Sequence, residues 1–348
     1  MDFANEIIAW YNINKRSLPW RETKDPYIIW LSEIIMQQTR VDQGTPYFNR
    51  FAEKYPTVAD FAAASEDEIL HLWQGLGYYS RGRNMLHTAR MVLEEHGGYF
   101  PKNYDELLKL KGIGEYTAAA ISSFSANEAK AVLDGNVFRL LSRFYGIDTP
   151  INSAEGKKIF TALANTVMDK RHAGIYNQAI MEFGSLQCKP IKPLCSICPL
   201  NLFCAALLKN DVDRLPVKIK IKKISKRYFN FVVAVKNEEL LMQKRQNKDI
   251  WHNLYQLPLV ETENPIDPEK LLQNPDFIDL FGADSRIINV SATIKHLLSH
   301  QTLFARFISI KNFSDINALS QGFFYANSTD FQKLAKPKLI FEFLKKFF

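Results

Sequence analysis

Residues 107–121 read Leu-Leu-Lys-Leu-Lys-Gly-Ile-Gly-Glu-Tyr-Thr-Ala-Ala-Ala-Ile, with Gly112 and Gly114 between two segments of helical character. Glycine at each end of a tight turn lets the backbone approach a phosphate closely, and the free N–H groups of the second helix then point at that phosphate. A lone Gly-x-Gly is more often the end of a helix. Here the flanking helical segments and the small residues 117–120 favour a helix-hairpin-helix motif that holds DNA without reading its sequence.

The sequence around this motif predicts an all-helical region. Apolar residues recur there at spacings of three and four, and glycine, proline and asparagine separate the segments. We therefore expect almost no strand before residue 205. The segments expected to be helical are 27–40, 67–74, 81–96, 104–110, 116–124, 135–144 and 154–168.

The periodicity changes after residues 205–227. Apolar residues alternate with other residues from Phe229 to Val235, up to a turn at 236–239, and this pattern is typical of a β-hairpin. The chain contains no internal repeat. Further strands are expected at 302–310 and 322–326, and helices near 268–272 and 331–347.

Length and composition set the class of protein. The chain of 348 residues is long enough for two domains, and 47% apolar with 23% charged residues is close to the average of globular proteins. This composition excludes disordered, collagen-like and coiled-coil chains. The longest run without a charge, residues 193–208, is shorter than the roughly 20 residues of a membrane-spanning helix, so we expect no membrane span.

The distribution of charge points to one basic segment. Lysine and arginine number 44 against 37 acidic residues, a net charge of +7. Residues 205–227 carry most of this excess, and the sequence leaves open whether they form a solvated linker or a strap that contacts phosphates. The cations are Lys209, Arg214, Lys218, Lys220, Lys222, Lys223, Lys226 and Arg227, against Asp211 and Asp213.

All four cysteines lie close together in the sequence, at Cys188, Cys195, Cys198 and Cys204, with the spacing C-x6-C-x2-C-x5-C. Disulfides are rare in a reducing cytosol, and four thiols at such short spacings favour a metal centre. Structural zinc and an iron–sulfur cluster both accept four thiolates. The spacing alone leaves these two possibilities open.

Two acidic residues lie within apolar runs. Glu33 lies among bulky apolar neighbours in an expected helix, where burial would raise its pKa and make it a proton donor. A surface glutamate is the alternative. Asp134 precedes the expected helix 135–144, so it is either a helix N-cap or a catalytic acid.

Together these residues resemble the adenine DNA glycosylases of the MutY type, within the helix-hairpin-helix glycosylase superfamily. The resemblance covers nearly the whole chain. It implies an all-α helix-hairpin-helix domain with a [4Fe–4S] loop, followed by an α+β MutT-like (Nudix-like) domain. The stretches that carry it are Leu18-Pro19-Trp20-Arg21, Asp25-Pro26-Tyr27, the Glu33 segment, residues 75–81, Asp134, Met181-Glu182-Phe183-Gly184 and the four cysteines.

The resemblance also implies domain limits. The helical catalytic domain would comprise residues 1–204, with a six-helix-barrel lobe at about 28–130. The iron–sulfur lobe would combine residues 1–27 with about 131–204. A basic linker at 205–227 would precede a MutT-like domain at 228–348 that recognises 8-oxoguanine.

The implied activity is excision of adenine mispaired with 8-oxoguanine, and less efficiently with guanine, from duplex DNA. Glu33 would protonate the adenine at N7 and then handle water, while an ionised Asp134 would stabilise the cationic sugar. Arg21 and Glu182 would help to hold the adenine or its strand. The residues inserted into the duplex would be Gln38, Leu76 and Tyr78, although ordinary core packing is the alternative for Leu76.

One position separates two chemistries. Relatives of the endonuclease III type attack the sugar with a lysine two residues after the second hairpin glycine, where this chain has Tyr116. We therefore expect a monofunctional glycosylase, with Lys109 and Lys111 close enough to leave weak strand cleavage open. The alternatives are a pyrimidine-lesion glycosylase with lyase activity and a non-catalytic iron–sulfur protein that binds DNA.

The family's lesion-probing loop corresponds to residues 295–300, Lys-His-Leu-Leu-Ser-His, although leucine replaces the more usual phenylalanine before Ser299. Ser299 and His300 can donate or accept hydrogen bonds at a base edge, and an ordinary strand turn is the alternative. Residues 259–280 lack the glutamate-rich metal box of a diphosphate hydrolase. We expect a monomer in the bacterial cytoplasm, bound to the nucleoid, because the chain begins with acids rather than with a cationic leader.

Overall fold

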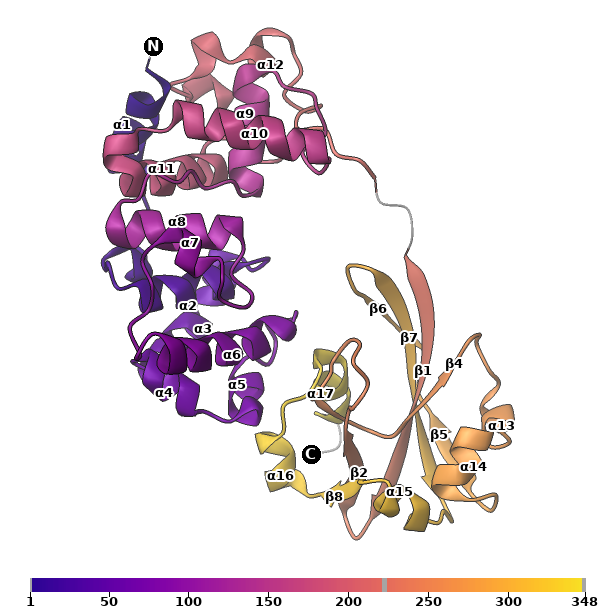
Figure 1. Ribbon diagram of the computed structural model, residues 1–348. Coiled ribbons are helices and arrows are strands. Elements are labelled where there is room, and N and C mark those ends of the chain that lie inside the picture. Colours follow the sequence, from indigo (N-terminus) through magenta and orange to yellow (C-terminus); the bar gives the residue numbers. More distant parts are fainter. Residues whose placement is uncertain (1, 221–223, 346–348) are drawn as a thin grey trace. The chain divides into compact units, whose positions relative to one another are not determined.

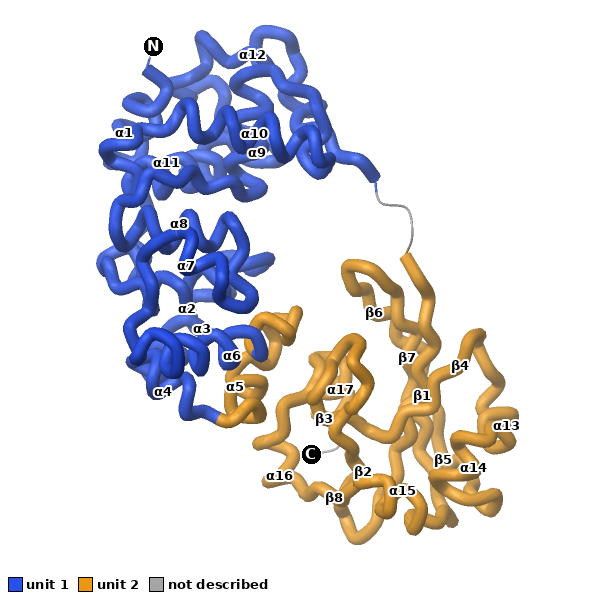
Figure 2. Tube along the Cα trace, in the orientation of Figure 1, with its two compact units in different colours: residues 1–64, 83–220 blue, residues 65–82, 221–348 orange. Residues whose placement is uncertain are grey.

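The computed structural model describes residues 2–220 and 224–345, and the chain divides into two compact units (Figures 1 and 2). Unit 1 comprises Met1–Ala64 and Arg83–Lys220, and unit 2 comprises Ser65–Gly82 and Ile221–Phe348. These limits differ from the expected domains at two places. Residues 205–220 group with the helical unit, and residues 65–82 group with the C-terminal part of the chain.

Helices build unit 1, and its described residues contain no strand. Most of the spans expected from apolar spacing are present within a few residues. The helices are α1 (Phe3–Asn14), α2 (Pro26–Met36), α3 (Val41–Lys54), α4 (Val58–Ala63), α6 (Ser80–Glu95, beginning in unit 2), α7 (Tyr104–Leu107), α8 (Glu115–Ala126), α9 (Gly135–Tyr145), α10 (Ala154–Val167), α11 (Ala173–Leu186) and α12 (Ala205–Leu208), with short 3-10 turns at Pro19–Arg21, Lys170–His172, Cys195–Ile197 and Asn201–Phe203.

Side-chain caps explain where several of these helices begin. The Asp25 carboxylate accepts the N–H of Tyr27 at the start of α2, and Ser153 accepts that of Gly156 at the start of α10. Such a cap satisfies one of the N–H groups that a helix leaves free at its first turn. The polar residues that precede these apolar segments in the sequence are therefore the N-caps at which the helices begin.

Two groups of apolar side chains form the core of unit 1. Trp30 of α2 packs against Phe61 of α4, which in turn contacts Tyr55 and stacks on Phe51 of α3 at 5.9 Å. A second cluster joins α1, α8, α9, α10 and α11 around fully buried residues such as Phe183. α2 and α11 both pack against α8, so the two clusters meet along that helix.

The helix-hairpin-helix motif is formed by α7, α8 and the turn between them. Gly112 has φ +80°, and a side chain there would lie 2.9 Å from the Cβ of Asn84, so glycine is required on both counts. Gly114 is the N-cap of α8, and no side chain caps it. No heavy atom lies within 4 Å of the position that a Cβ on Gly114 would take, so the backbone at the start of α8 is open on that side.

Unit 2 contains a mixed sheet, with the strand order β3-β2-β1-β7-β5 in the described residues. β1 and β2 form the expected hairpin, while β1 and β7 are parallel. The strands are β1 (Ser225–Lys236), β2 (Glu239–Lys244), β3 (Tyr255–Gln256), β4 (Leu259–Thr262), β5 (Arg286–Val290), β6 (Ile294–Leu297), β7 (Gln301–Lys311) and β8 (Phe324–Ala326), and the helices are α5 (Glu66–Leu72), α13 (Pro268–Leu271), α14 (Pro275–Phe281), α15 (Ile316–Ser320), α16 (Ser328–Lys333) and α17 (Lys338–Leu344).

The alternation expected along β1 is wrong, because residues 229–234 are all buried. Val232 contributes to the core cluster that includes Phe277 of α14. On the other side, Phe231 stacks on Phe307 of β7, and Phe307 stacks on α17. When both faces of a central strand are buried, neither face needs polar side chains, and its sequence need not alternate between apolar and polar residues.

The helix expected at 331–347 is two helices, since α17 begins after Pro337, whose ring fixes φ and lacks an N–H. Residues 346 and 347 of that expectation lie outside the described part. Within the described residues, no helix is long and apolar enough to cross a membrane.

Candidate active site

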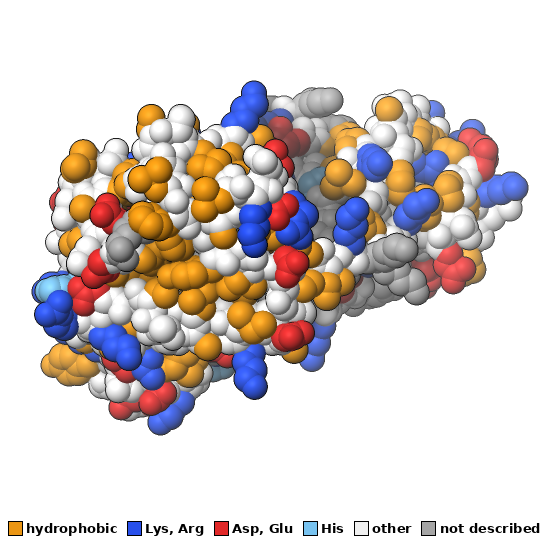
Figure 3. Space-filling view, turned by 90° about the horizontal axis from the view of Figure 1, so that it is seen from above, with side chains coloured by type: hydrophobic (Ala, Val, Ile, Leu, Met, Phe, Trp, Pro, Cys, Tyr) orange, Lys and Arg blue, Asp and Glu red, His pale blue; other side chains and the backbone are white. Residues whose placement is uncertain are grey.

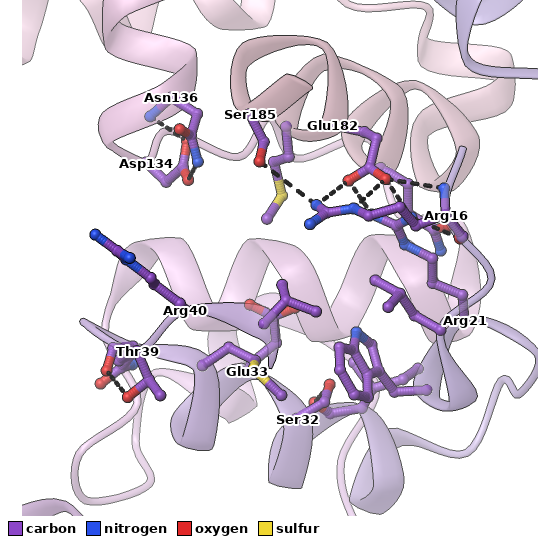
Figure 4. Close-up of a pocket in the computed structure, with 18 of the residues that line it drawn as sticks. Arg16, Arg21, Ser32, Glu33, Thr39, Arg40, Asp134, Asn136, Glu182 and Ser185 are labelled. Carbon is purple, nitrogen blue, oxygen red and sulfur yellow. Dashed lines mark hydrogen bonds and ion pairs between the residues drawn. The ribbon is translucent and has the colours of Figure 1, made fainter. Parts of the chain in front are cut away.

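A cavity of about 590 Å³ lies in unit 1 and contains both acids singled out in the sequence (Figure 4). α2 contributes Glu33, the N-cap of α9 contributes Asp134, and α11 contributes Glu182. Glu33 and Asp134 thus share one cavity although they are a hundred residues apart in the sequence. Two acids can act on one substrate only if they line the same cavity, and Glu33 and Asp134 meet this requirement.

Glu33 is buried in the wall of the cavity, with 9% of its surface exposed. Burial raises its pKa to about 7, and the negative charge of Asp134 acts in the same direction. The hydrogen bond from Tyr116 and the charge of Arg21 oppose this rise. A carboxyl group with this pKa is partly protonated at neutral pH and can act as an acid.

Tyr116, two residues after Gly114, donates its hydroxyl hydrogen to Oε2 of Glu33 at 2.6 Å. Its oxygen also lies 3.9 Å from the sulfur of Met181. Burial and the charge of Glu33 raise the pKa of the phenol well above its ordinary value. Tyr116 therefore remains a neutral donor, and it orients the carboxyl group of Glu33.

Asp134 is the N-cap of α9, as one of its two interpretations predicted. Its Oδ1 accepts the N–H groups of Asn136 at 2.9 Å and Val137 at 2.8 Å, and its Oδ2 accepts the Asn136 amide at 2.7 Å. Burial raises the pKa of Asp134, while these three donors and Arg139 act against the rise. The hydrogen bonds of the cap hold the carboxylate at the cavity, so a role as helix N-cap and a role as catalytic acid are compatible for Asp134.

A glycine allows this close approach of α9 to α11. A side chain at Gly184 would lie 2.8 Å from both the Cβ and the carbonyl oxygen of Asn136. The guanidinium of Arg139 joins the same two helices, donating to the Gly184 carbonyl at 2.6 Å and to the Asn136 amide oxygen at 2.9 Å. Gly184, which follows Glu182 in the sequence, thus helps to place Asp134.

Glu182 has only 1% of its side chain exposed and is held by two arginines. Arg21 donates to both of its carboxylate oxygens, at 3.0 and 2.7 Å, and Arg16 does so at 2.8 and 2.6 Å. Burial acts to raise the pKa of Glu182, but the arginine hydrogen bonds prevail and lower it to about 2. Figure 4 shows this cluster on the side of the cavity opposite Asp134.

Sequence reasoning missed Arg16 and Asn136. Arg16 lies 166 positions from its partner Glu182, and nothing in its local sequence distinguishes it from other exposed cations. Asn136 had a signal, because an amide two residues after an N-cap aspartate is within reach of its carboxylate.

The three residues expected to enter the duplex differ in exposure. Gln38 is exposed in the loop after α2, has φ +55° and lines the cavity. In unit 2, Tyr78 is 50% exposed, whereas Leu76 is only 7% exposed. Leu76 is therefore packed as its core alternative describes, and its insertion into the duplex stays a prediction.

Ser299 and His300 are exposed in the turn between β6 and β7 of unit 2. The turn closes with a hydrogen bond from the N–H of Leu298 to the carbonyl of Gln301 at 2.9 Å. Ser299 makes a short hydrogen bond with the hydroxyl of Tyr78. The turn and the 75–78 loop are therefore in contact within unit 2.

The four cysteines border one small pocket of unit 1. In the described residues, no three Cys, His, Asp or Glu side chains are arranged as the ligands of a metal ion. The donor set nevertheless fits an iron–sulfur cluster. Four thiols that border one pocket match the four ligands of such a cluster, and the buried Arg143, whose Nη1 lies 3.5 Å from the sulfur of Cys188, would offset part of their negative charge when they ionise.

The surface of this cysteine segment is apolar and basic. Several of its large hydrophobic side chains are exposed, namely Ile191, Ile197, Leu202 and Phe203, whereas Leu200 is buried. Figure 3, which looks down on this end of unit 1, shows hydrophobic groups interspersed with lysines and arginines.

Ion pairs occupy two cations of the basic segment. Arg214 pairs with Asp211 at 2.8 Å, and Arg227 pairs with Glu261 at 2.6 Å. Lys222 and Lys223 lie outside the described residues. A phosphate strap, one of the two interpretations of this segment, would therefore have fewer available charges than the sequence count indicates.

Family comparisons match the two parts of the chain separately. Residues 31–165 match the family described as HhH-GPD superfamily base excision DNA repair protein, and residues 230–346 match the NUDIX domain. A solved structure of a thermostable thymine-DNA glycosylase is similar over 60% of this chain and 95% of its own, with a TM-score of 0.56 and 29% identity. An endonuclease III–DNA complex has the same fold, with a TM-score of 0.52 and 22% identity over 60% of this chain and 94% of its own.

These matches confirm the expected fold class, and they place the chain among base-excision DNA repair proteins that carry a Nudix-like domain. An adenine DNA glycosylase of Buchnera aphidicola is 35% identical over 87% of this chain and 84% of its own length. The human adenine DNA glycosylase is 39% identical over 61% of this chain and 41% of its own. The chain belongs to the adenine DNA glycosylase family.

Proposed function

We propose that this protein removes adenine mispaired with 8-oxoguanine, and less efficiently with guanine, from duplex DNA by hydrolysing the N-glycosidic bond. The observation that carries the proposal is the pairing of Glu33, with a pKa of about 7, and Asp134 in one cavity. The relatives named adenine DNA glycosylase indicate that the excised base is adenine. The cavity of about 590 Å³ is within the usual size range of small-molecule sites.

Glu33 acts first, as the acid. Its proton goes to N7 of adenine, so that the base leaves as a neutral molecule, and the resulting carboxylate then accepts a proton from the attacking water. Asp134 stays ionised, because three N–H donors stabilise its carboxylate, and it offsets the positive charge that develops on the sugar. Two acids of one cavity thus serve in opposite protonation states.

The arginine-held Glu182 binds rather than reacts. With both oxygens occupied by Arg16 and Arg21, it stays ionised and holds the guanidinium groups at the cavity wall. Arg21 lies 5.6 Å from the ring centre of Tyr11, which further limits its motion. The cluster provides a fixed polar wall for the adenine or its strand.

The reaction ends at the abasic site. A lyase needs an amine nucleophile to form a Schiff base, whereas the corresponding position holds Tyr116, whose hydroxyl donates to Glu33. Water is therefore the nucleophile that completes the reaction, and the DNA strand stays intact.

Duplex DNA is the partner. The uncapped start of α8 behind Gly112 and Gly114 offers N–H groups to a phosphate, and a structural relative of this fold is a complex with DNA. Gln38 and Tyr78 are the exposed residues assigned to the gap left by the extruded base. Ser299 and His300 read the base opposite the adenine.

Cys188, Cys195, Cys198 and Cys204 would hold the [4Fe–4S] cluster. A cluster with four protein thiolates has no open ligand position, so it would supply structural stability or electron exchange and not hydrolysis. Arg143 contributes to this region without the cluster as well, by donating to the carbonyl groups of Lys189 and Pro190.

A gel assay tests the proposal. Labelled duplexes with adenine opposite 8-oxoguanine, adenine opposite guanine, and thymine glycol are incubated with the protein, with and without alkali. We expect product from the first two duplexes only, and only after alkali. Cleavage of the thymine glycol strand without alkali would instead indicate the endonuclease III-like alternative, and binding without any release would indicate a non-catalytic DNA-binding protein.

A further inference from the structure

Residues 65–82 form part of unit 2 although the sequence places them inside the helical domain (Figure 2). The segment contains α5 and the loop 75–78, which includes the exposed Tyr78. Two groups of hydrogen bonds connect it to the C-terminal part of the chain. The first group involves Glu66 and Asp67, and the second involves Gln74 and Tyr79, which flank the loop.

The first group centres on Asp67 of α5. Lys244 Nζ lies 2.7 Å from its Oδ1, and the Tyr255 hydroxyl donates to its Oδ2 at 2.9 Å. Lys244 and Tyr255 are direct partners in the β2–β3 ladder, so their side chains project on the same face of the sheet. Beside them, the Asn253 amide donates to Oε1 of Glu66 at 2.6 Å.

The second group involves the backbone of Lys336. Its N–H donates to Oε1 of Gln74, and its carbonyl accepts the hydroxyl hydrogen of Tyr79, both at 3.1 Å. Lys336 is 1% exposed, and its ammonium donates to the carbonyl groups of Phe331 and Leu334. This buried residue therefore fixes both ends of the loop 75–78.

The loop itself has a defined shape. Gly75, Gly77 and Tyr78 have positive φ values of 103°, 72° and 46°. The indole N–H of Trp73 donates to the Gly77 carbonyl at 2.9 Å, and the hydroxyl of Tyr78 contacts Ser299. Since its ends, its backbone and its exposed ring all have partners in unit 2, the position of the loop depends on that unit.

We propose that Asp67, Lys244 and Tyr255 are positioning residues that fix the loop 75–78 to the Nudix-like domain, so that this domain places Tyr78 against the DNA. The inference rests on the function proposed above. The turn at Ser299 would read the base opposite adenine, and Tyr78 would enter the duplex. Both depend on the contacts that join the loop 75–78 to unit 2, so the two events are coupled. A duplex with 8-oxoguanine engages that turn fully and depends more on the coupling than a duplex with guanine.

Asp67→Ala in the full-length protein tests this, with Asp284→Ala, an exposed carboxylate of the same unit, as the matched control. We measure hydrogen–deuterium exchange in peptides covering 66–82 and 115–126, and single-turnover adenine release opposite 8-oxoguanine and guanine. We expect faster exchange in 66–82 and unchanged exchange in 115–126. The rate of adenine release opposite 8-oxoguanine, divided by the rate opposite guanine, should fall about two- to fivefold. This is the range for loss of a partly exposed ion pair with one added hydrogen bond.

A charge swap gives an independent test. Asp67→Lys should reduce the rate ratio further, and Asp67→Lys combined with Lys244→Asp should restore most of it, because the ion pair reforms with its charges exchanged. The inference is wrong if Asp67→Ala and Asp284→Ala behave alike, if exchange rises without a change in the rate ratio, or if the swap restores nothing. Absence of adenine release by the wild-type protein would instead contradict the proposed function, and the exchange measurement would still decide whether Asp67 fixes the loop.

Discussion

Two buried glutamates line the same cavity and have opposite pKa shifts. Glu33 is 9% exposed and has a pKa raised to about 7, whereas Glu182, 1% exposed, has one lowered to about 2. Burial acts to raise both pKa values. The difference lies in the partners, because Glu33 receives one neutral phenol and Glu182 receives two guanidinium groups.

The comparison shows how one cavity holds a proton donor and a permanent anion. A neutral donor stabilises either protonation state of a carboxyl group, so desolvation still decides the outcome at Glu33. Two cations in bidentate contact offset desolvation entirely at Glu182. The charge of the partner, and not the depth of burial, therefore sets the direction of the pKa shift at Glu33 and at Glu182.

Removing the proton of Glu33 is expected to have the largest effect. Glu33→Gln keeps the shape and an acceptor for Tyr116 but cannot protonate adenine, so excision should fall by about 10²- to 10⁴-fold. Single-turnover release from a duplex with adenine opposite 8-oxoguanine measures the loss. DNA affinity, followed by fluorescence anisotropy, should stay unchanged. Turnover near that of the wild type would remove Glu33 from the mechanism.

Asp134→Asn removes the negative charge and retains a good N-cap for α9. Loss of the charge that stabilises the sugar should slow excision by about 10²- to 10³-fold. The same single-turnover assay measures this, and circular dichroism checks that helix content is retained. A variant that binds DNA normally and releases adenine at the wild-type rate contradicts the assignment of Asp134.

Arg21→Gln removes one of the two cations that hold Glu182. With the carboxylate left buried beside Arg16 alone, the free energy of unfolding at pH 7 should fall by about 2–3 kcal/mol. The pKa of Glu182 is lowered by folding, so this stabilisation exists above its unfolded value of 4.5 and disappears as pH falls toward 2. Urea unfolding at pH 7 and pH 3 should therefore show a smaller loss at pH 3, with Lys15→Gln as the exposed control. Equal losses at both pH values would contradict an ionic origin.

Local patterns predicted those parts of this site that depend on local structure. The helix around Glu33, the cap at Asp134 and the Gly112–Gly114 turn each follow from residues within a few positions of one another. Their chemical roles came from resemblance to the glycosylase family. That Glu33 and Asp134 share a cavity also required the structure.

Long-range pairing was beyond the reach of the sequence. Arg16 and Glu182 meet only because α1 and α11 pack together, and no residue near Arg16 indicates this. Residues 65–82 group with the C-terminal unit, and their hydrogen bonds to it involve partners about 180 or more positions away, which no local pattern identifies. The parallel pairing of β1 with β7 joins strands far apart in the sequence. Both faces of β1 are buried between 229 and 234, so the alternation expected there did not correspond to an exposed face.

Glu33→Gln should stabilise the protein at alkaline pH. Folding raises the pKa of Glu33 from 4.5 to about 7. Below pH 4.5 the group is protonated in both states, so its ionisation does not affect the free energy of unfolding. Between pH 4.5 and about 7 that free energy falls, and above about pH 7 the loss is constant. Replacing it should raise the free energy of unfolding by about 1–2 kcal/mol at pH 8.5 and by much less at pH 4. Thermal unfolding of both proteins at the two pH values measures this difference. A gain that is the same at pH 4 would mean that Glu33 is not the titrating group.

The smallest effect is expected from Tyr116→Phe, which removes the hydrogen bond that the phenol donates to Glu33. The Tyr116 hydrogen bond lowers the pKa of Glu33, so without it the pKa should rise further, by less than about one unit. The rate of adenine release falls as Glu33 loses its proton, and the midpoint of that fall should therefore move from about pH 7 to a higher pH. Single-turnover rates between pH 6 and pH 9 measure the midpoint, with Tyr104→Phe as a control, since the Tyr104 ring contacts Lys130 and does not line the Glu33 cavity. A midpoint that moves to lower pH would show that the phenol stabilises the protonated acid, and the contrast between one neutral donor at Glu33 and two cations at Glu182 would then need a different physical origin.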